Sequence, residues 1–174
     1  MVLGCRAAEF DLGTRGTLSV GIPDDWRING KEAKRPDGTE IGYVFAIKPR
    51  GEANAKCLLT LAYTTNGAPN KESIRKEVLR ATEMFVAESV EKKQNLKDFS
   101  MGTGFGAYCL FTDASLVGKK AKPDDYKVMG SGQVQPGDNM VGVVSLFADD
   151  AEGSEMKTML KIINSLKVTP KAAK

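Results

Sequence analysis

Alternating hydrophobic and polar residues predict extended strands in the first third of the chain. Leu18, Val20 and Ile22 alternate with polar or small residues, and the same period returns over residues 41–47. Residues 57–63 are apolar on both faces, a pattern typical of a central strand covered on both sides. Together these segments predict a β-sheet.

Two later segments carry hydrophobic residues at helical spacing. Asn70 is a good helix N-cap, and residues 71–93 then present one apolar stripe. Ser154 is a second candidate N-cap, and residues 156–166 present another stripe. The sequence therefore predicts two amphipathic helices, each of which needs an apolar surface to cover.

The chain between these helices is rich in extended segments. Residues 99–117 are strand-like but broken by the glycines of 102–106, which indicates a bend. Residues 126–134 and 140–148 are two more extended segments, and proline and glycine at 135–138 predict a hairpin turn between them.

The order of these elements predicts the α+β class, because strands occur in runs between two isolated helices. We expect an α/β/α sandwich, a twisted antiparallel sheet with a helix on each face. With 174 residues, 41% hydrophobic and 27% charged, the chain is predicted to be one globular domain. That domain spans residues 10–168, between a leader remnant or tail at 1–9 and a flexible tail at 169–174.

The charge balance limits the classes of partner. A net charge of +3 is too balanced for a dedicated nucleic-acid binder. The densest basic segment, residues 27–35, contains glycine and precedes proline, so it predicts a loop that is either solvated or a surface for an anionic partner. The candidate partner surface consists of Trp26, Arg27, Lys31, Lys34 and Arg35. Trp26 is interpreted as a core-edge residue, with a ligand-stacking role together with the Phe105 region as the alternative.

The three cysteines suggest different roles. Cys57 and Cys109 lie in apolar runs, where they are either inert buried thiols or a disulfide between neighbouring strands. Residues 2–5, Val-Leu-Gly-Cys, resemble a bacterial lipobox that ends at Cys5, and residues 5–8 fit equally the small-residue end of an ordinary secretory signal. Cys5 is therefore a candidate lipidation site, which would need an apolar leader upstream.

Few residues suggest catalysis. Histidine is absent, which excludes histidine bases and histidine metal ligands. The glycines of 102–106 lead into a strand, so they do not fit a dinucleotide-binding loop. Ser-x-x-Lys spacing lacks the companion motifs of serine–lysine enzymes at each place where it occurs: Ser73–Lys76, Ser89–Lys92 and Ser154–Lys157. Paired aspartates fall in turns, at 24–25, 124–125 and 149–150. We therefore predict no catalytic residue, no metal and no cofactor.

One family resemblance covers residues 10–168. The turn Ile22-Pro23-Asp24-Asp25-Trp26, the order of the elements and the final helix ending at residues 162–167 resemble the PsbP-like superfamily. That group includes the photosystem II extrinsic protein, a Ran-binding nuclear-import factor and bacterial DcrB-type exported lipoproteins. The resemblance implies an α/β/α sandwich and transfers no function, because members of one fold bind different partners.

These observations favour a non-enzymatic, exported bacterial binding or accessory protein, in the periplasm or cell envelope. Its partner is expected to be a protein, and its only membrane contact a lipid anchor on Cys5. The alternative is a cytosolic adaptor or chaperone-like module with reduced thiols, and a small-ligand carrier is a third hypothesis.

Overall fold

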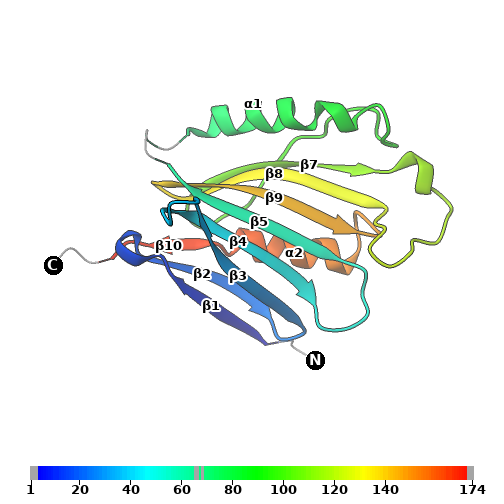
Figure 1. Cartoon of the computed structure of the whole chain (residues 1–174). Coiled ribbons are helices and arrows are strands. Elements are labelled where there is room, and N and C mark those ends of the chain that lie inside the picture. The colour runs from blue at the N-terminus through cyan, green and yellow to red at the C-terminus, as the bar shows by residue number, and fades with distance from the viewer. Residues whose placement is uncertain (1–3, 65–66, 68, 172–174) are drawn as a thin grey trace.

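The strands form two antiparallel sheets (Figure 1). The computed structural model describes residues 4–64, 67 and 69–171. The small sheet has the strand order β1-β2-β10, and the large sheet has the order β3-β4-β5-β9-β8-β7-β6. The fold belongs to the α+β class, as predicted, but it has two sheets in place of the single sheet that we expected.

The strands of the small sheet are β1 (Cys5–Asp11), β2 (Thr17–Pro23) and β10 (Lys167–Thr169). Those of the large sheet are β3 (Trp26–Lys34), β4 (Glu40–Pro49), β5 (Lys56–Tyr63), β6 (Lys97–Asp98), β7 (Phe105–Thr112), β8 (Val128–Gly137) and β9 (Met140–Ala148). The α-helices are α1 (Lys71–Thr82) and α2 (Ser154–Asn164), and three 3-10 turns span Gly13–Arg15, Glu83–Phe85 and Ala114–Leu116.

The two helices pack against different hydrophobic clusters. Helix α1 lies over β7 and β8, where Ile74 and Val78 pack on Ala107 and Phe111. Helix α2 and the small sheet share the other, larger cluster with the inner side chains of β4, β5, β8 and β9. Its most deeply buried members include Leu18, Ile22, Phe45, Leu146, Met159 and Ile163. Burial of such side chains supplies most of the folding free energy, at about 25 cal/mol per Å².

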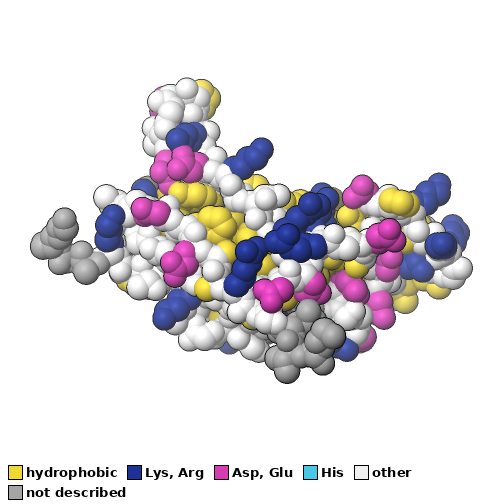
Figure 2. Space-filling model, turned by 90° about the horizontal axis from the view of Figure 1, so that it is seen from below, with side chains coloured by type: hydrophobic (Ala, Val, Ile, Leu, Met, Phe, Trp, Pro, Cys, Tyr) yellow, Lys and Arg dark blue, Asp and Glu magenta, His cyan; other side chains and the backbone are white. Residues whose placement is uncertain are grey.

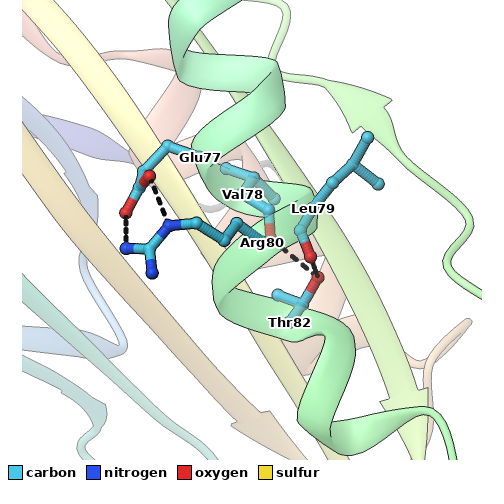
Figure 3. A network of polar contacts seen from close by, with 5 residues as sticks. All are labelled: Glu77, Val78, Leu79, Arg80 and Thr82. Carbon is cyan, nitrogen blue, oxygen red and sulfur yellow. Dashed lines mark hydrogen bonds and ion pairs between the residues drawn. The ribbon is translucent and has the colours of Figure 1, made fainter.

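The first helix is shorter than predicted. Asn70 caps it, since its Oδ1 accepts a hydrogen bond from the Ser73 amide at 2.8 Å. At its end the Thr82 hydroxyl donates to the Val78 carbonyl at 2.8 Å (Figure 3), and the Gln94 side chain donates to the Thr82 hydroxyl. The prediction of a helix through residue 93 is wrong, because α1 ends at Thr82, a 3-10 turn follows at Glu83–Phe85, and the chain then turns back so that Gln94 reaches Thr82. Val90 is consequently 50% exposed.

Three other parts of the chain differ from the sequence prediction. The basic segment predicted as a loop is strand β3, which lies at the edge of the large sheet, where charged side chains reach solvent. Strand β1 begins at Cys5, so residues 5–9 of the predicted leader remnant or tail are paired with β2. Strand β10 includes Thr169, and residues 172–174 of the predicted flexible tail lie outside the described residues.

The predicted hairpin and the predicted second helix are both present, with small differences at their ends. Strands β8 and β9 form the predicted hairpin, although β8 extends to Gly137, beyond the predicted strand end. Helix α2 begins at Ser154, but its N-cap is Gly153. Four helix residues of its apolar stripe are buried in the core: Met156, Met159, Ile162 and Ile163.

Candidate functional site

Of the two alternatives for Cys57 and Cys109, the structure has the inert buried thiols and not the disulfide. Cys57 lies on β5 and Cys109 on β7, with β9 and β8 between them, so about 14 Å separates them at about 4.8 Å per strand spacing. The two thiols also lie on opposite faces, because the row through Cys57, Leu146 and Gly130 ends at Leu110, not at Cys109. All three cysteines are free, and Cys5 is exposed. Burial raises the pKa of the Cys57 thiol to about 12 and also raises that of Cys109, so both are poor nucleophiles at neutral pH.

Trp26 belongs to the core. Only 3% of it is exposed, and its carbonyl accepts a hydrogen bond from the Arg50 guanidinium at 3.1 Å. The core-edge interpretation is therefore confirmed, and the ring is not available to stack on a ligand. Phe105, its partner in the ligand-carrier hypothesis, lines a cavity at one end of the large sheet.

The basic candidates do not form one surface. Arg27 and Lys31 project from the same face of β3, because they are four residues apart in a strand. Lys34 forms an exposed ion pair with Glu32 at 2.6 Å. Arg35 lies in the turn between β3 and β4. The structure thus brings together Arg27 and Lys31, and separates them from the other three predicted residues.

The face of the large sheet that carries α1 is only partly covered. Lys31, Val44, Thr60 and Val143 lie directly opposite one another on β3, β4, β5 and β9. Side chains in such a row point to one face, and the row continues through β8 to Ala107, which packs beneath α1. Helix α1 contacts β7 and β8 (Figure 1), so the strands beyond them lie open on this side.

Hydrophobic side chains are exposed on these open strands. Val44 is 42% exposed and Val143 is 51% exposed. The sequence predicted that β5 is covered on both sides, but Thr60 and Ala62 are exposed. That part of the prediction is wrong. We call this surface the open face, and it consists of Val44, Ala46, Leu58, Thr60, Val141, Val143 and Ser145.

The margin of the open face is basic. Arg27 lies opposite Lys48 on this face, Lys31 opposite Val44, and Lys56 opposite Phe147. The described strand residues on this face of β3, β4, β5 and β9 include no aspartate or glutamate. The acidic residues near this margin come from loops, since Glu52, Asp124 and Asp149 line one hollow together with Arg27 and Lys48. The open face therefore has an apolar floor and strands whose charges are all basic.

On the other side, α1 forms a wall whose charges are paired. Arg80 donates to Glu77 at 2.9 Å, and Figure 3 shows both side chains extending from the same side of the helix. The hydrogen bond from Arg80 lowers the pKa of Glu77. On one flank of α1, Arg75 binds Asp98 of β6. The Glu77–Arg80 pair lies on the opposite flank of the helix, which faces β9. This wall therefore adds little net charge to the open face.

An aromatic hollow lies on the same side of the sheet. Its volume is about 280 Å³. The Tyr126 and Phe147 rings are 5.3 Å apart, and those of Phe85 and Phe111 are 5.7 Å apart. Phe147 follows Val143 and Ser145 on the same face of β9, so the hollow extends the open face with a deeper apolar site.

The underside of the molecule has mixed charge. Figure 2 shows Lys and Arg side chains in a short band across the middle of that surface, with hydrophobic side chains beside it and acidic ones at its edges. Both signs of charge lie close together there.

The candidate serine–lysine pair Ser89–Lys92 does not form a side-chain hydrogen bond. The Lys92 ammonium donates to the Ala87 carbonyl at 2.6 Å rather than to Ser89. Asn54 holds two of the aspartate turns together, because its side-chain amide donates to the Asp149 carboxylate at 3.0 Å and to the backbone oxygen of Asp125 at 3.3 Å. Within the described part of the chain, no group of three or more potential ligands could hold a metal ion.

Comparison of the chain with protein-family models, with curated proteins and with solved structures found no match. None of the helices within the described ranges is long and apolar enough to cross a membrane.

Proposed function

We propose that the protein is a non-enzymatic, exported bacterial binding or accessory protein whose open face holds a protein partner. The observation that carries this proposal is the exposure of Val44 and Val143 on a face that α1 covers only in part. We further propose a PsbP-like α/β/α sandwich, in which the small sheet and α2 together form the layer opposite α1.

An open hydrophobic sheet face is unusual in a folded protein, and exposed apolar patches commonly mark interaction sites. From β9 to β4 the face is about 10 Å wide, at about 4.8 Å per strand spacing. Helices pack about 8–10 Å apart, so there is room for one further helix beside α1. The aromatic hollow would take a large apolar side chain from such a helix.

The charges favour one kind of helix. On the described strands of this face the charged side chains are all basic: Arg27, Lys31, Lys48 and Lys56. Acidic loop residues lie near Arg27 and Lys48 only. The proposed occupant is therefore an amphipathic helix of a partner protein, with an apolar face and acidic residues along the edge that lies over β3 and β4. Such complementarity chiefly raises the association rate and selects the orientation.

Two observations support the proposals that the protein is not an enzyme and that it is located in the cell envelope. The buried thiols of Cys57 and Cys109 have raised pKa values, which makes them unsuitable nucleophiles. Cys5 is exposed at the start of β1, so a lipid attached to it would extend away from the fold. The alternative, a cytosolic adaptor, would use the same open face without the lipid.

A photo-crosslinking amino acid at Thr60, introduced in the native host, tests the proposed face. The control position is Lys157, which is exposed on α2. We expect a discrete adduct from position 60 that is absent from position 157 and is lost when Val143→Arg is added. The same adducts from both positions, or none from position 60, would contradict the proposal. The intact mass of the native protein then separates the two locations, because a lipid on Cys5 places it in the envelope and three unmodified thiols favour the cytosol.

A further inference from the structure

A second interaction surface lies at the free edge of strand β1. The small sheet has the strand order β1-β2-β10, so β1 pairs with β2 on one side and with no described strand on the other. Its pairing with β2 runs without interruption from Cys5 to Asp11, and Figure 1 shows β1 at the lower margin of the molecule. The backbone groups of such an edge can pair with a strand of another molecule.

Two hydrogen bonds show which residues of β1 bond to β2. The Asp24 amide donates to the Gly4 carbonyl at 3.1 Å, which makes Gly4 and Asp24 a hydrogen-bonded pair. Gly21, which lies opposite Ala7, instead donates its amide to the Ser165 hydroxyl at 2.8 Å. In an antiparallel ladder, hydrogen-bonded pairs alternate with pairs that are not hydrogen-bonded, so the even-numbered residues of β1 bond to β2.

The odd-numbered residues of β1 therefore turn their N–H and C=O groups to the open side. These residues are Cys5, Ala7, Glu9 and Asp11, and all four are exposed. The Asp11 carbonyl already accepts a hydrogen bond from the Tyr43 hydroxyl at 2.8 Å. Within the described structure, this leaves Cys5, Ala7 and Glu9 with both backbone groups free.

The other sheet edges are protected in ways that β1 is not. Strands β6 and β10 are only two and three residues long. Strand β3 carries Arg27, Lys31 and Lys34, and its register shifts at its last residue. Short, lysine-bearing and irregular edges resist pairing with other chains. Strand β1 has no lysine and no proline, and the small residues Ala7 and Ala8 lie at its centre.

The positions of the free groups favour a second copy of this chain as the occupant. A two-fold axis at Ala7 brings Cys5 opposite Glu9 of the second copy, so that every free group has a partner. An axis at Ala8 would instead use the Asp11 carbonyl, which already has a donor. The strand is therefore self-complementary in one register, a property that an unrelated strand would not need.

We propose that β1 pairs with β1 of a second copy of this chain, antiparallel and centred on Ala7. Glu9 then lies opposite Cys5 of the second copy. On the other face of the strand, Arg6 lies opposite Ala8, so no like charges are directly opposed. The two small sheets continue as one sheet. A single strand pair buries less than the roughly 1,200 Å² at the lower end of stable complexes, so the dimer should dissociate on dilution.

Disulfide trapping tests the register, in the recombinant full chain that carries no lipid on Cys5. Opposite Cα atoms of a hydrogen-bonded pair lie about 5.5 Å apart, within reach of a disulfide. Ala7→Cys in a Cys5→Ser background should therefore give a linked dimer on mild oxidation. Glu9→Cys in the same background is the matched control, because the two positions 9 lie about 13 Å apart along the strands. Glu9→Cys with Cys5 retained should link again, because positions 9 and 5 are opposite.

Sedimentation velocity without oxidant measures the pairing itself. The dimer fraction of the Cys5→Ser chain should rise between about 10 and 500 µM. Ala7→Pro removes the two N–H groups nearest the axis but none that bonds to β2, so the dimer affinity should fall by ~10-fold or more. The emission of the buried Trp26 shows whether this variant is folded. If it is not, Ala7→Glu places two carboxylates opposite each other and should also weaken the dimer.

The same measurements separate this proposal from the open face. Val143→Arg should leave the dimer unchanged, whereas its loss in Val143→Arg would show that two copies meet through the open face instead. A monomer at every concentration, no linking by Ala7→Cys, or equal linking by Ala7→Cys and Glu9→Cys in the Cys5→Ser background would overturn the proposal. None of these results bears on whether a partner protein binds the open face.

Discussion

Gly104→Ala measures how firmly the glycine-rich segment before β7 is held. The φ of +76° is costly for any residue with a Cβ, by about 1–2 kcal/mol. In addition, the Cβ would collide with the Gln135 backbone oxygen at 1.9 Å, and forcing an atom into a packed site costs about 1–3 kcal/mol. We therefore expect the free energy of unfolding to fall by about 2–5 kcal/mol.

Two other glycines separate these contributions. Gly38 has a φ of +84° but open space around it, so Gly38→Ala should lose only the conformational part, about 1–2 kcal/mol. Gly102 has neither a positive φ nor a neighbour within 4 Å. Gly102→Ala should leave stability unchanged or raise it by up to about 1 kcal/mol, because alanine restricts the unfolded chain.

The assay is urea unfolding followed by tryptophan fluorescence. Trp26 is the single tryptophan and is 3% exposed, so its emission reports loss of the core. If Gly104→Ala loses no more stability than Gly38→Ala, the contact with the Gln135 backbone does not constrain the segment. A loss in Gly102→Ala as large as that in Gly104→Ala would show that the whole segment is constrained for another reason.

Three further predictions follow from burial and hydrogen bonding. In a thiol-labelling assay without reductant, the folded recombinant protein, which carries no lipid on Cys5, should expose one reactive thiol, Cys5, and the unfolded protein three; a pair missing after unfolding would contradict the free buried thiols. Burial acts to raise the pKa of Glu91, but hydrogen bonds from the Thr112 amide and hydroxyl, at 2.9 and 2.8 Å, outweigh it and lower the pKa. The resulting stabilisation is present above the ordinary pKa of 4.5 and is lost as pH falls through the lower pKa of the folded state. In urea unfolding, Glu91→Gln should therefore lower the free energy of unfolding by about 1–3 kcal/mol at pH 7 and by less at pH 3. An equal loss at the two pH values would refute this. Met159→Ala should lose about 2–5 kcal/mol in the same assay, whereas Met84→Ala, at a position 75% exposed, should lose almost none, and similar losses would place Met159 outside the core.

The elements that the sequence predicts well are those specified by nearby residues. Asn70 caps the helix that follows it, through a hydrogen bond within three residues. The stripe of α2 is buried as its spacing indicates. The first helix ends early because Thr82 interacts with Gln94, and no periodic pattern contains that contact.

Strand β3 shows a different limit of sequence analysis. Its glycine and its many charges are typical of a loop, yet every residue from Trp26 to Ala33 has a partner on β4. An edge strand needs only one neighbour, and charged side chains on it discourage pairing with other molecules. Composition alone therefore could not distinguish this edge strand from a solvated loop.

The open face and the buried Gln135 were missed for a related reason. Val143 alternates with buried residues of β9 and is indistinguishable in sequence from a covered position. Whether a helix lies over it depends on where α1 ends and on the strand order, which are both long-range properties. For Gln135, the sequence showed only a predicted turn, and the bulge that buries its side chain appears only in the pairing of β8 with β9.

The fold carries two free-energy costs that the isolated chain does not offset locally. Exposed valines on the open face leave apolar area in water, and the unpaired oxygen of Gln135 leaves a buried acceptor without a donor. The core shared by α2 and the small sheet is extensive enough for the fold to tolerate them. Departures from local consistency of this kind tend to occur where a protein binds something.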